Sequence, residues 1–138
     1  MMNRFEKANE IYSNLKDYIS NKSKFKPEIK RTVIKNIYPL VVFEELTNTL
    51  ESVSQDCNSL EEMRNLSYEI NIYAIPQNEI DADQICSEIA NLVMNIMQKY
   101  YHMQGGLDAR FININSSKAT QYTLRFYCKW YMARNMIY

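Results

Sequence analysis

Glycine, proline, cysteine and histidine are all scarce in this 138-residue chain, and each shortage excludes a class of site. Two glycines, Gly105 and Gly106, cannot form the glycine-rich loop before a helix that cradles a phosphate group. Three cysteines at wide spacing argue against a disulfide framework and for a reducing compartment. One histidine, His102, and the lack of a Cys-x-x-Cys motif disfavour a metal site. No apolar run reaches the roughly 18 residues that cross a bilayer, so we expect no membrane contact. From the shortages of glycine, cysteine and histidine we expect no cofactor and no metal.

The acidic residues do not offer an evident catalytic pair either. Glu44 and Glu45 fall within a predicted strand, where neighbouring side chains point to opposite faces and cannot share a proton. Glu61 and Glu62 lie in a polar stretch, and we expect them to be solvated. His102 is the only histidine available as a base, and nothing in the sequence directs a nucleophile towards it. We therefore expect a protein that is not an enzyme, although a catalytic set assembled from distant acids stays open.

The charges cancel over the whole chain but are sorted along it. Residues 1–38 carry nine bases and four acids, residues 39–90 carry one base and eleven acids, and residues 91–138 carry six bases and one acid. The net charges of these blocks are therefore +5, −10 and +5. Such sorting can leave a positive and a negative patch on the folded surface. The alternative is that folding intermixes the blocks.

Hydrophobic periodicity predicts an α+β fold in a single domain, with a mainly antiparallel sheet of four to five strands and two helices packed on one face. The second helix should bury a stripe that runs from Ile85 through Leu92 to Tyr100. Gly105–Gly106 marks the turn that leaves it. A long polar connection, with a short helix around Leu60–Asn65, should join two of the strands. The expected elements are a helix over 3–21, strands over 32–37, 40–46, 68–74, 110–115 and 122–132, the polar connection over 47–65, and the second helix over 81–101.

The last predicted strand has two contrasting faces. One face is apolar and belongs to the core: Tyr122, Leu124, Phe126, Cys128, Trp130 and Met132. The other face mixes cations with tyrosines, a composition that favours contact with another surface. It consists of Thr123, Arg125, Tyr127, Lys129 and Tyr131. The alternative for this second face is a solvated sheet surface with ordinary cross-strand Tyr–Lys pairs.

Two segments resemble a known family. The strand Pro39-Leu40-Val41-Val42-Phe43-Glu44-Glu45 begins with proline and ends in acids, and Leu66-Ser67-Tyr68-Glu69-Ile70-Asn71-Ile72-Tyr73-Ala74 precedes a helix and a closing hairpin. This order resembles the tail terminator (tail completion) proteins of long-tailed bacteriophages and prophages, over about Phe5 to Tyr131. The resemblance implies a ring, usually of six copies, that caps the tail tube and provides the face to which the head joins. It also implies a location at the tail–neck junction of the virion, after assembly in the host cytoplasm.

The implied partners are other copies of this chain, the tail tube protein and a head–tail connector or stopper protein, with DNA passing through the lumen without specific binding. Sorted charges suit a ring, because each subunit must present two different patches to its neighbours. The candidate interface residues are Lys22, Lys24, Lys26, Lys30, Arg31, Glu44, Glu45, Glu61, Glu62, Arg125, Tyr127, Lys129 and Tyr131. The alternatives are another head–tail joining or neck component, a nucleic-acid-binding module that uses Lys22–Arg31 with Arg125 and Lys129, and a small enzyme that uses scattered acids.

Overall fold

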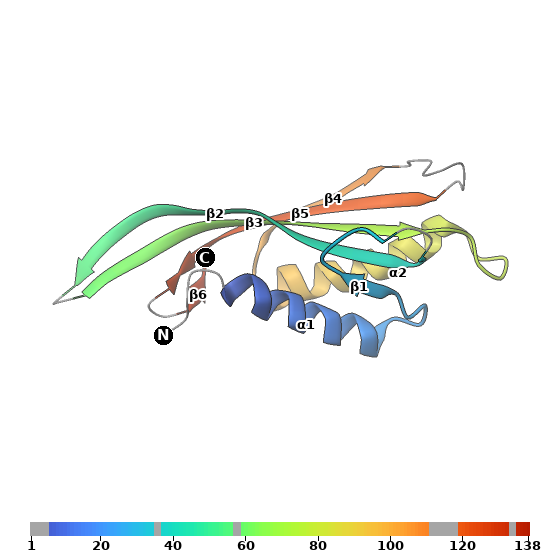
Figure 1. Ribbon diagram of the computed structural model, residues 1–138, viewed down its shortest axis with the longest axis horizontal. Helices are drawn as coiled ribbons and strands as arrows, with labels where there is room; N and C mark the ends of the chain where they lie inside the picture. The colour runs from blue at the N-terminus through green and yellow to red at the C-terminus, as the bar shows by residue number, and fades with distance from the viewer. Residues whose placement is uncertain (1–5, 35–36, 57–58, 111–118, 133–134) are drawn as a thin grey trace.

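Two helices lie across one face of a long, twisted sheet, and none of the residues that the structure describes forms a helix on the other face (Figure 1). The computed structural model describes residues 6–34, 37–56, 59–110, 119–132 and 135–138. The helical elements are α1 (Glu6–Lys22), α2 (Ala82–Met94) and the π-helix η1 (Asn95–Tyr100) that continues α2. The strands are β1 (Glu28–Lys30), β2 (Leu40–Asp56), β3 (Ser59–Ala74), β4 (Gln104–Arg110), β5 (Thr120–Tyr131) and β6 (Met136–Ile137).

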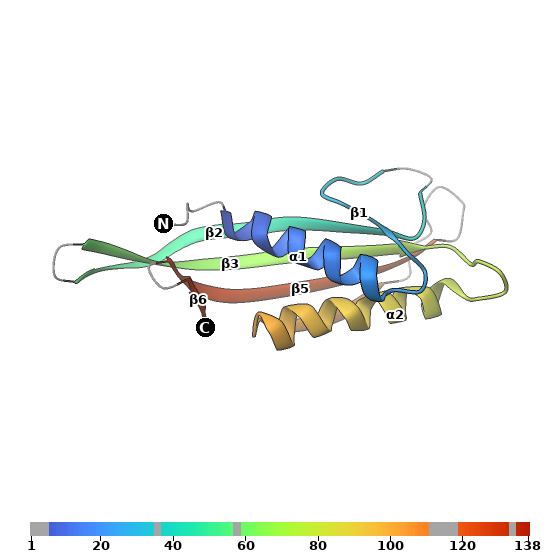
Figure 2. The same cartoon turned by 90° about the horizontal axis from the view of Figure 1, so that it is seen from below.

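The six strands form one sheet in the order β1-β2-β3-β5-β4, with β6 paired to the end of β5. β1 runs parallel to β2, and every other pairing is antiparallel. Figure 2 shows α1 and α2 side by side beneath the central strands. The expected α+β fold with two helices on one face is confirmed, and the sheet has slightly more strands than expected.

The core lies between this helix pair and the sheet. Strict alternation in β3 and β5 directs one apolar face of each strand to the helices, and helical spacing does the same for α1 and α2. Phe43 and Tyr68 stack there, with ring centroids 5.3 Å apart. The largest side chains in this layer are almost fully buried: Ile11, Leu15, Ile19, Phe43, Leu66, Tyr68, Ile70, Ile72, Ile85, Phe126 and Trp130. The predicted apolar face of the last strand is therefore confirmed from Tyr122 to Trp130.

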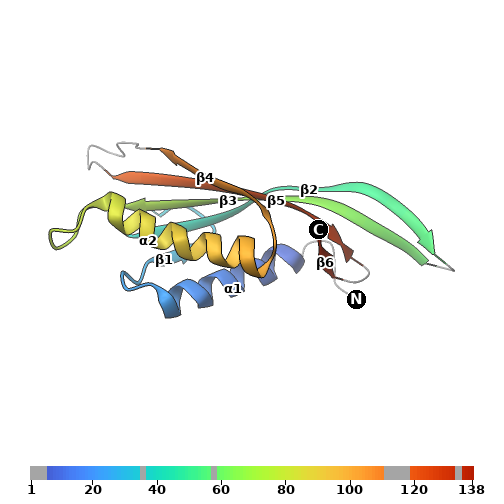
Figure 3. The ribbon, with the colours of Figure 1, turned by 180° about the vertical axis from the view of Figure 1, so that it is seen from behind.

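The predicted polar connection over 47–65, including its short helix, is wrong. These residues extend β2 and β3 into a hairpin that projects beyond the helices (Figure 3). Register shifts at Glu45/Thr47 and Leu50/Ser52 break the alternation of β2, so the period-two signal is lost. The projecting part also has no helix beneath it, so its side chains need not be apolar.

The strand predicted over 32–37 is also wrong in position. The parallel strand forms earlier, at Glu28–Lys30, where Ile29 is buried and pairs with Val41. Residues 33, 34 and 37 have no regular structure, and residues 35 and 36 lie outside the described part of the chain. A three-residue strand with a single buried side chain gives too short a pattern for sequence periodicity to detect.

The second helix departs from the expected stripe at its end. In η1 the Tyr101 amide donates to the carbonyl of Ile96, five residues back, so this turn holds one residue more than an α-helical turn. The extra residue exposes Tyr100 and buries Tyr101. The predicted stripe is correct as far as Ile96, and the expected burial of Tyr100 is wrong.

The glycine pair lies inside β4 and does not form the predicted turn. Gly105 has φ +123°, and a Cβ added there would lie 2.1 Å from the Arg125 carbonyl oxygen. Glycine is therefore required for β4 to approach β5. The strand predicted over 110–115 begins earlier than expected, at Gln104, and residues 111–115 lie outside the described chain.

Candidate interaction surface

The uncovered face of the sheet carries the cation-and-tyrosine pattern of β5. Arg125, Tyr127 and Lys129 are exposed on it, whereas Thr123 is 3% exposed. Tyr131, the last member of the predicted set, is half-buried where β5 meets β6. The structure therefore brings together three of the five predicted residues as an accessible row.

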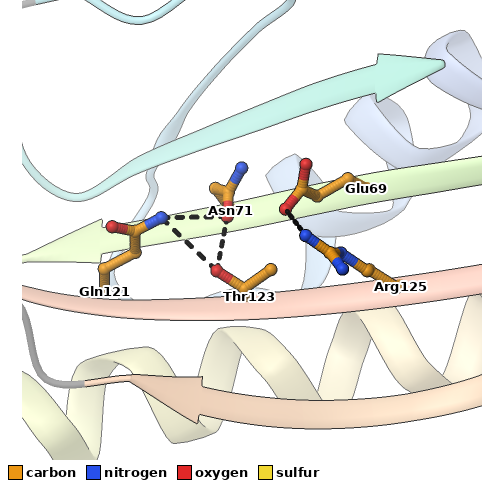
Figure 4. Close-up of polar contacts among 5 residues, drawn as sticks. All are labelled: Glu69, Asn71, Gln121, Thr123 and Arg125. Carbon is orange, nitrogen blue, oxygen red and sulfur yellow. Dashed lines mark hydrogen bonds and ion pairs between the residues drawn. The ribbon is translucent and has the colours of Figure 1, made fainter. Parts of the chain in front are cut away.

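A hydrogen-bonded group fixes the middle of this face (Figure 4). Thr123 Oγ1 donates to Asn71 Oδ1 at 2.7 Å, and Gln121 Nε2 donates to the same oxygen at 3.0 Å. Asn71 and Thr123 are directly paired across β3 and β5 and are almost fully buried. The buried amide oxygen of Asn71 therefore accepts two hydrogen bonds, which satisfy it away from water. The sequence alone does not reveal this group, because its contacts depend on the register between β3 and β5.

The two cations of the row are paired within the same subunit. Arg125 Nη2 lies 3.4 Å from Glu69 Oε1, and Lys129 Nζ lies 2.6 Å from Glu51 Oε1. Such exposed pairs contribute at most about 1 kcal/mol each to stability. They nevertheless balance the charge of the face, which weakens its case as a phosphate-binding surface. They also join acids of residues 39–90 to bases of residues 91–138, so folding intermixes the charge blocks here.

Arg31 is exposed but lies against side chains of α1 and β2. Its Nη1 donates to Asn9 Oδ1 at 2.6 Å, and its guanidinium lies 5.3 Å from the ring centroid of Tyr12 and 5.7 Å from that of Phe43. A guanidinium stacked between α1 and β2 contributes to packing as well as charge. Lys30 Nζ lies 3.9 Å from Glu28, its neighbour in β1. Lys30 and Arg31 are therefore the residues of the predicted basic stretch whose charged groups contact other side chains of the same subunit.

Lys22, Lys24 and Lys26 form an exposed group at the end of α1, which we call the lysine cluster. Lys26 Nζ donates to the Ser20 carbonyl at 2.8 Å, and Lys24 Nζ lies 5.7 Å from the Phe25 ring centroid. Within the part of the chain that the structure describes, none of the three lies within ion-pair distance of a carboxylate. The lysine cluster is therefore the part of the predicted basic stretch that has no ion pair in the described chain.

The acids differ sharply in their surroundings. Glu44 is exposed on the uncovered face, and Glu45 is half-buried on the helix side, so the predicted opposite orientation is confirmed. Burial raises the pKa of Glu45, and nearby Arg31 and Arg64 oppose that shift. Glu62 is not a freely solvated acid as expected: its Oε2 lies 3.1 Å from Arg64, and its side chain is 16% exposed. The side chain of Glu61 lies outside the described part.

Arg64 links β2 and β3 near the point where the hairpin begins to project. Its Nη2 donates to the Asn48 carbonyl at 3.0 Å while Nη1 holds Glu62, and Arg64 itself is 9% exposed. A buried guanidinium needs such partners, because an unpaired one would be strongly destabilising. The sequence shows Arg64 as the only base among eleven acids in residues 39–90, which is the one signal that could have marked it.

A polar hollow of about 310 Å³ lies between α1 and the end of η1. Lys7, which is 4% exposed, lies 2.7 Å from Glu10 and donates to Asn135 Oδ1 at 3.0 Å. His102 lines the hollow, with φ +56°. Lys7 was not predicted as a buried charge. Glu10 balances the charge of Lys7, so the polar contacts in this hollow have a structural role.

Thiol and metal chemistry find little support in the described chain. Burial raises the pKa of both Cys86 and Cys128 to about 12, which keeps these thiols protonated and unreactive near neutral pH. Among the residues that the structure describes, no group of three or more His, Cys, Asp or Glu side chains could hold a metal ion. No described helix is both long and apolar enough to span a bilayer.

Comparisons with known proteins give no family assignment. No protein-family model matches the chain, and no curated protein matches it by sequence. Function is therefore inferred from the fold, from the charged surface and from the resemblance of two strand sequences to those of tail terminator proteins.

Proposed function

We propose that this protein is a structural virion protein of the tail-terminator type, which forms a ring on the phage tail tube and presents the joining face to the head. The observation that carries the proposal is the extent of the sheet. Its β2–β3 hairpin passes beyond both helices, and in the described chain no helix covers the opposite face (Figures 1 and 3). A two-stranded ribbon is at best marginally stable alone in water, so a projecting hairpin is suited to contact with a partner.

The polar side chains of the described chain support adhesion more than reaction. Most charged groups on the sheet are matched one to one, as in Arg125–Glu69 and Lys129–Glu51. A reaction site instead gathers titratable groups with shifted pKa values around one cavity. The partners under this proposal are other copies of the chain, the tail tube protein and a connector or stopper protein.

The test is electron microscopy of tail tubes that lack their terminator, incubated with the purified protein. The proposal expects a ring at the head-proximal end of each tube and binding of heads only to the capped tubes. Binding to the head alone would favour the other neck component instead. Tubes that stay bare, and that join heads equally well without the protein, would refute both.

The nucleic-acid-binding alternative makes an opposite prediction. DNA affinity that falls steeply with salt would require several free cations along one groove. Arg31, Arg125 and Lys129 are engaged in the described chain, which leaves the lysine cluster alone. We therefore expect no appreciable DNA retention at physiological salt, which a filter-binding titration against ionic strength would measure.

A further inference from the structure

We propose that the uncovered face of the sheet binds a neutral saccharide in a hollow between the start of β4 and the end of β6. The hollow has a volume of about 340 Å³, and Tyr127 and Tyr138 are among the residues that line it. Small-molecule sites typically measure roughly 300–1,000 Å³, so this volume suits a small saccharide. The inference goes beyond the proposed function and does not depend on a ring, because a single subunit supplies every side chain of the hollow.

The hollow exists because two short strands share one edge of β5 and leave a gap between them (Figure 3). β3 occupies the other edge of β5 along its whole length. β4 begins where Gln104 pairs with Tyr127, and the backbone of Tyr138 exchanges two hydrogen bonds with that of Lys129, at 2.8 and 3.1 Å. Among the described residues, none pairs with Cys128 on this edge. The side chains of Gln104 and Tyr138 therefore border the gap from its two ends.

Two exposed tyrosines give the hollow its apolar surface. Tyr127 is 54% exposed and Tyr138 is 55% exposed. Tyr138 lies opposite Lys129, which is two residues from Tyr127 in β5, so alternation places all three side chains on the same face. A tyrosine ring has an apolar body and a polar tip, and it is favoured where one side of a contact is apolar and the other is wet. The C–H groups on one side of a sugar ring supply that apolar contact, and its hydroxyls supply the polar one.

Neutral polar groups complete the lining of the hollow. The side-chain amides of Asn65 and Gln104 line it and form no hydrogen bond within the part of the chain that the structure describes. The hydroxyls of Thr47 and Ser67 lie 2.6 Å apart, and only one of their two hydrogens is used in that contact. Amides and hydroxyls can both donate and accept hydrogen bonds. They therefore match the hydroxyls of a saccharide, which also do both.

The charges around the hollow favour a neutral ligand over an anion. Of the described side chains that line it, Lys129 alone carries a full charge. Its Nζ lies 2.6 Å from Glu51 Oε1, and Arg125, the next cation along β5, lies 3.4 Å from Glu69. A bound anion would face these carboxylates as well as the cations, whereas a neutral ligand would leave both ion pairs in place.

The test is binding of saccharides to the full chain, detected by saturation-transfer difference NMR and measured by isothermal titration calorimetry. The neutral probes are maltose, cellobiose, lactose and N,N′-diacetylchitobiose, and sialyllactose is the charged comparison. At least one neutral probe should bind, with an affinity that is the same at low salt and at about 1 M sodium chloride, because no charge is screened. Tyr127→Ala and Tyr138→Ala should each weaken its binding by about tenfold, as expected for the loss of an aromatic anchor. Tyr127→Phe keeps the ring and should retain most of the affinity.

The matched control is Tyr100→Ala, which removes a tyrosine that is 66% exposed but belongs to η1 on the helix side of the sheet. This control should bind like the wild type, and circular dichroism should show every variant folded. The inference is overturned if no neutral probe binds, if only sialyllactose binds, or if the affinity falls steeply with salt. It is also overturned if both β5-side alanine variants bind normally, or if the Tyr100→Ala protein is weakened as much as they are. A protein that caps tail tubes but binds no neutral saccharide contradicts this inference alone, and one that binds saccharide without capping contradicts the proposed function alone.

Discussion

Replacing Gly105 by alanine tests a close backbone approach between β4 and β5. The added Cβ would lie 2.1 Å from the Arg125 carbonyl oxygen and 3.0 Å from the Phe126 Cα, both of them backbone atoms of β5. Neither atom can rotate away, so β4 would have to move from β5. The residue also has φ +123°, where an L side chain is strained even without the clash.

Two contributions set the expected magnitude. Forcing an extra carbon into a packed site typically costs about 1–3 kcal/mol. Holding a residue with a Cβ in a sparsely populated backbone region adds about 1–3 kcal/mol. The two overlap, because movement of β4 relieves both, so we expect a loss of about 3 kcal/mol in the free energy of unfolding. That is a large fraction of the roughly 5–15 kcal/mol that holds an ordinary domain folded.

Urea denaturation followed by circular dichroism measures this loss, with Gln104→Ala as the control. Gln104 is the neighbouring residue of β4, and its side chain is exposed. The control should change stability by less than about 0.5 kcal/mol. A Gly105→Ala protein as stable as the Gln104→Ala protein would show that β4 does not approach β5 as described.

Three further predictions concern the core, the uncovered face and pH. Val93→Asp should unfold the protein in thermal melts, because it puts a carboxylate at a fully buried position. Leu92 is only half-buried, so Leu92→Asp should lower the melting temperature less. Equal effects of the two substitutions would contradict the helix register. Thr123→Val removes the donor to Asn71 and should cost about 1 kcal/mol in urea denaturation, and no measurable loss would contradict that hydrogen bond. The folded pKa of Cys86, about 12, lies above its ordinary 9.0, so its stabilising contribution is present below pH 9 and is lost as pH rises towards 12. The melting temperature should therefore fall over that range, and Cys86→Ala should reduce the fall; an unchanged pH dependence would argue against the burial of this thiol.

Sequence periodicity predicted the elements that make regular contact with the core. β5 alternates without a bulge for its whole length, so its two faces could be assigned from the sequence. The predicted buried stripe of α2 is correct up to Ile96. The π-helical turn then buries Tyr101 in place of Tyr100, and nothing in the local composition marks that change. The polar half of the hairpin was missed because two register shifts and the absence of a helix beneath it remove both signals of a strand.

The candidate surface was only partly predictable. Charged residues could be named from the sequence, but their partners are set by strand register over long separations. Lys129 pairs with Glu51, 78 residues away, and Arg125 with Glu69, 56 residues away. These pairs intermix the charge blocks in the sheet, whereas Lys22, Lys24 and Lys26 form no ion pair within the described subunit.

The features that concealed the hairpin from sequence analysis are the same features that allow it to exist in a free subunit. An uncovered strand with an unpaired edge invites aggregation, and proteins limit this with bulges and charged residues. β2 has both devices, with register shifts at Glu45/Thr47 and Leu50/Ser52 and acids along its length.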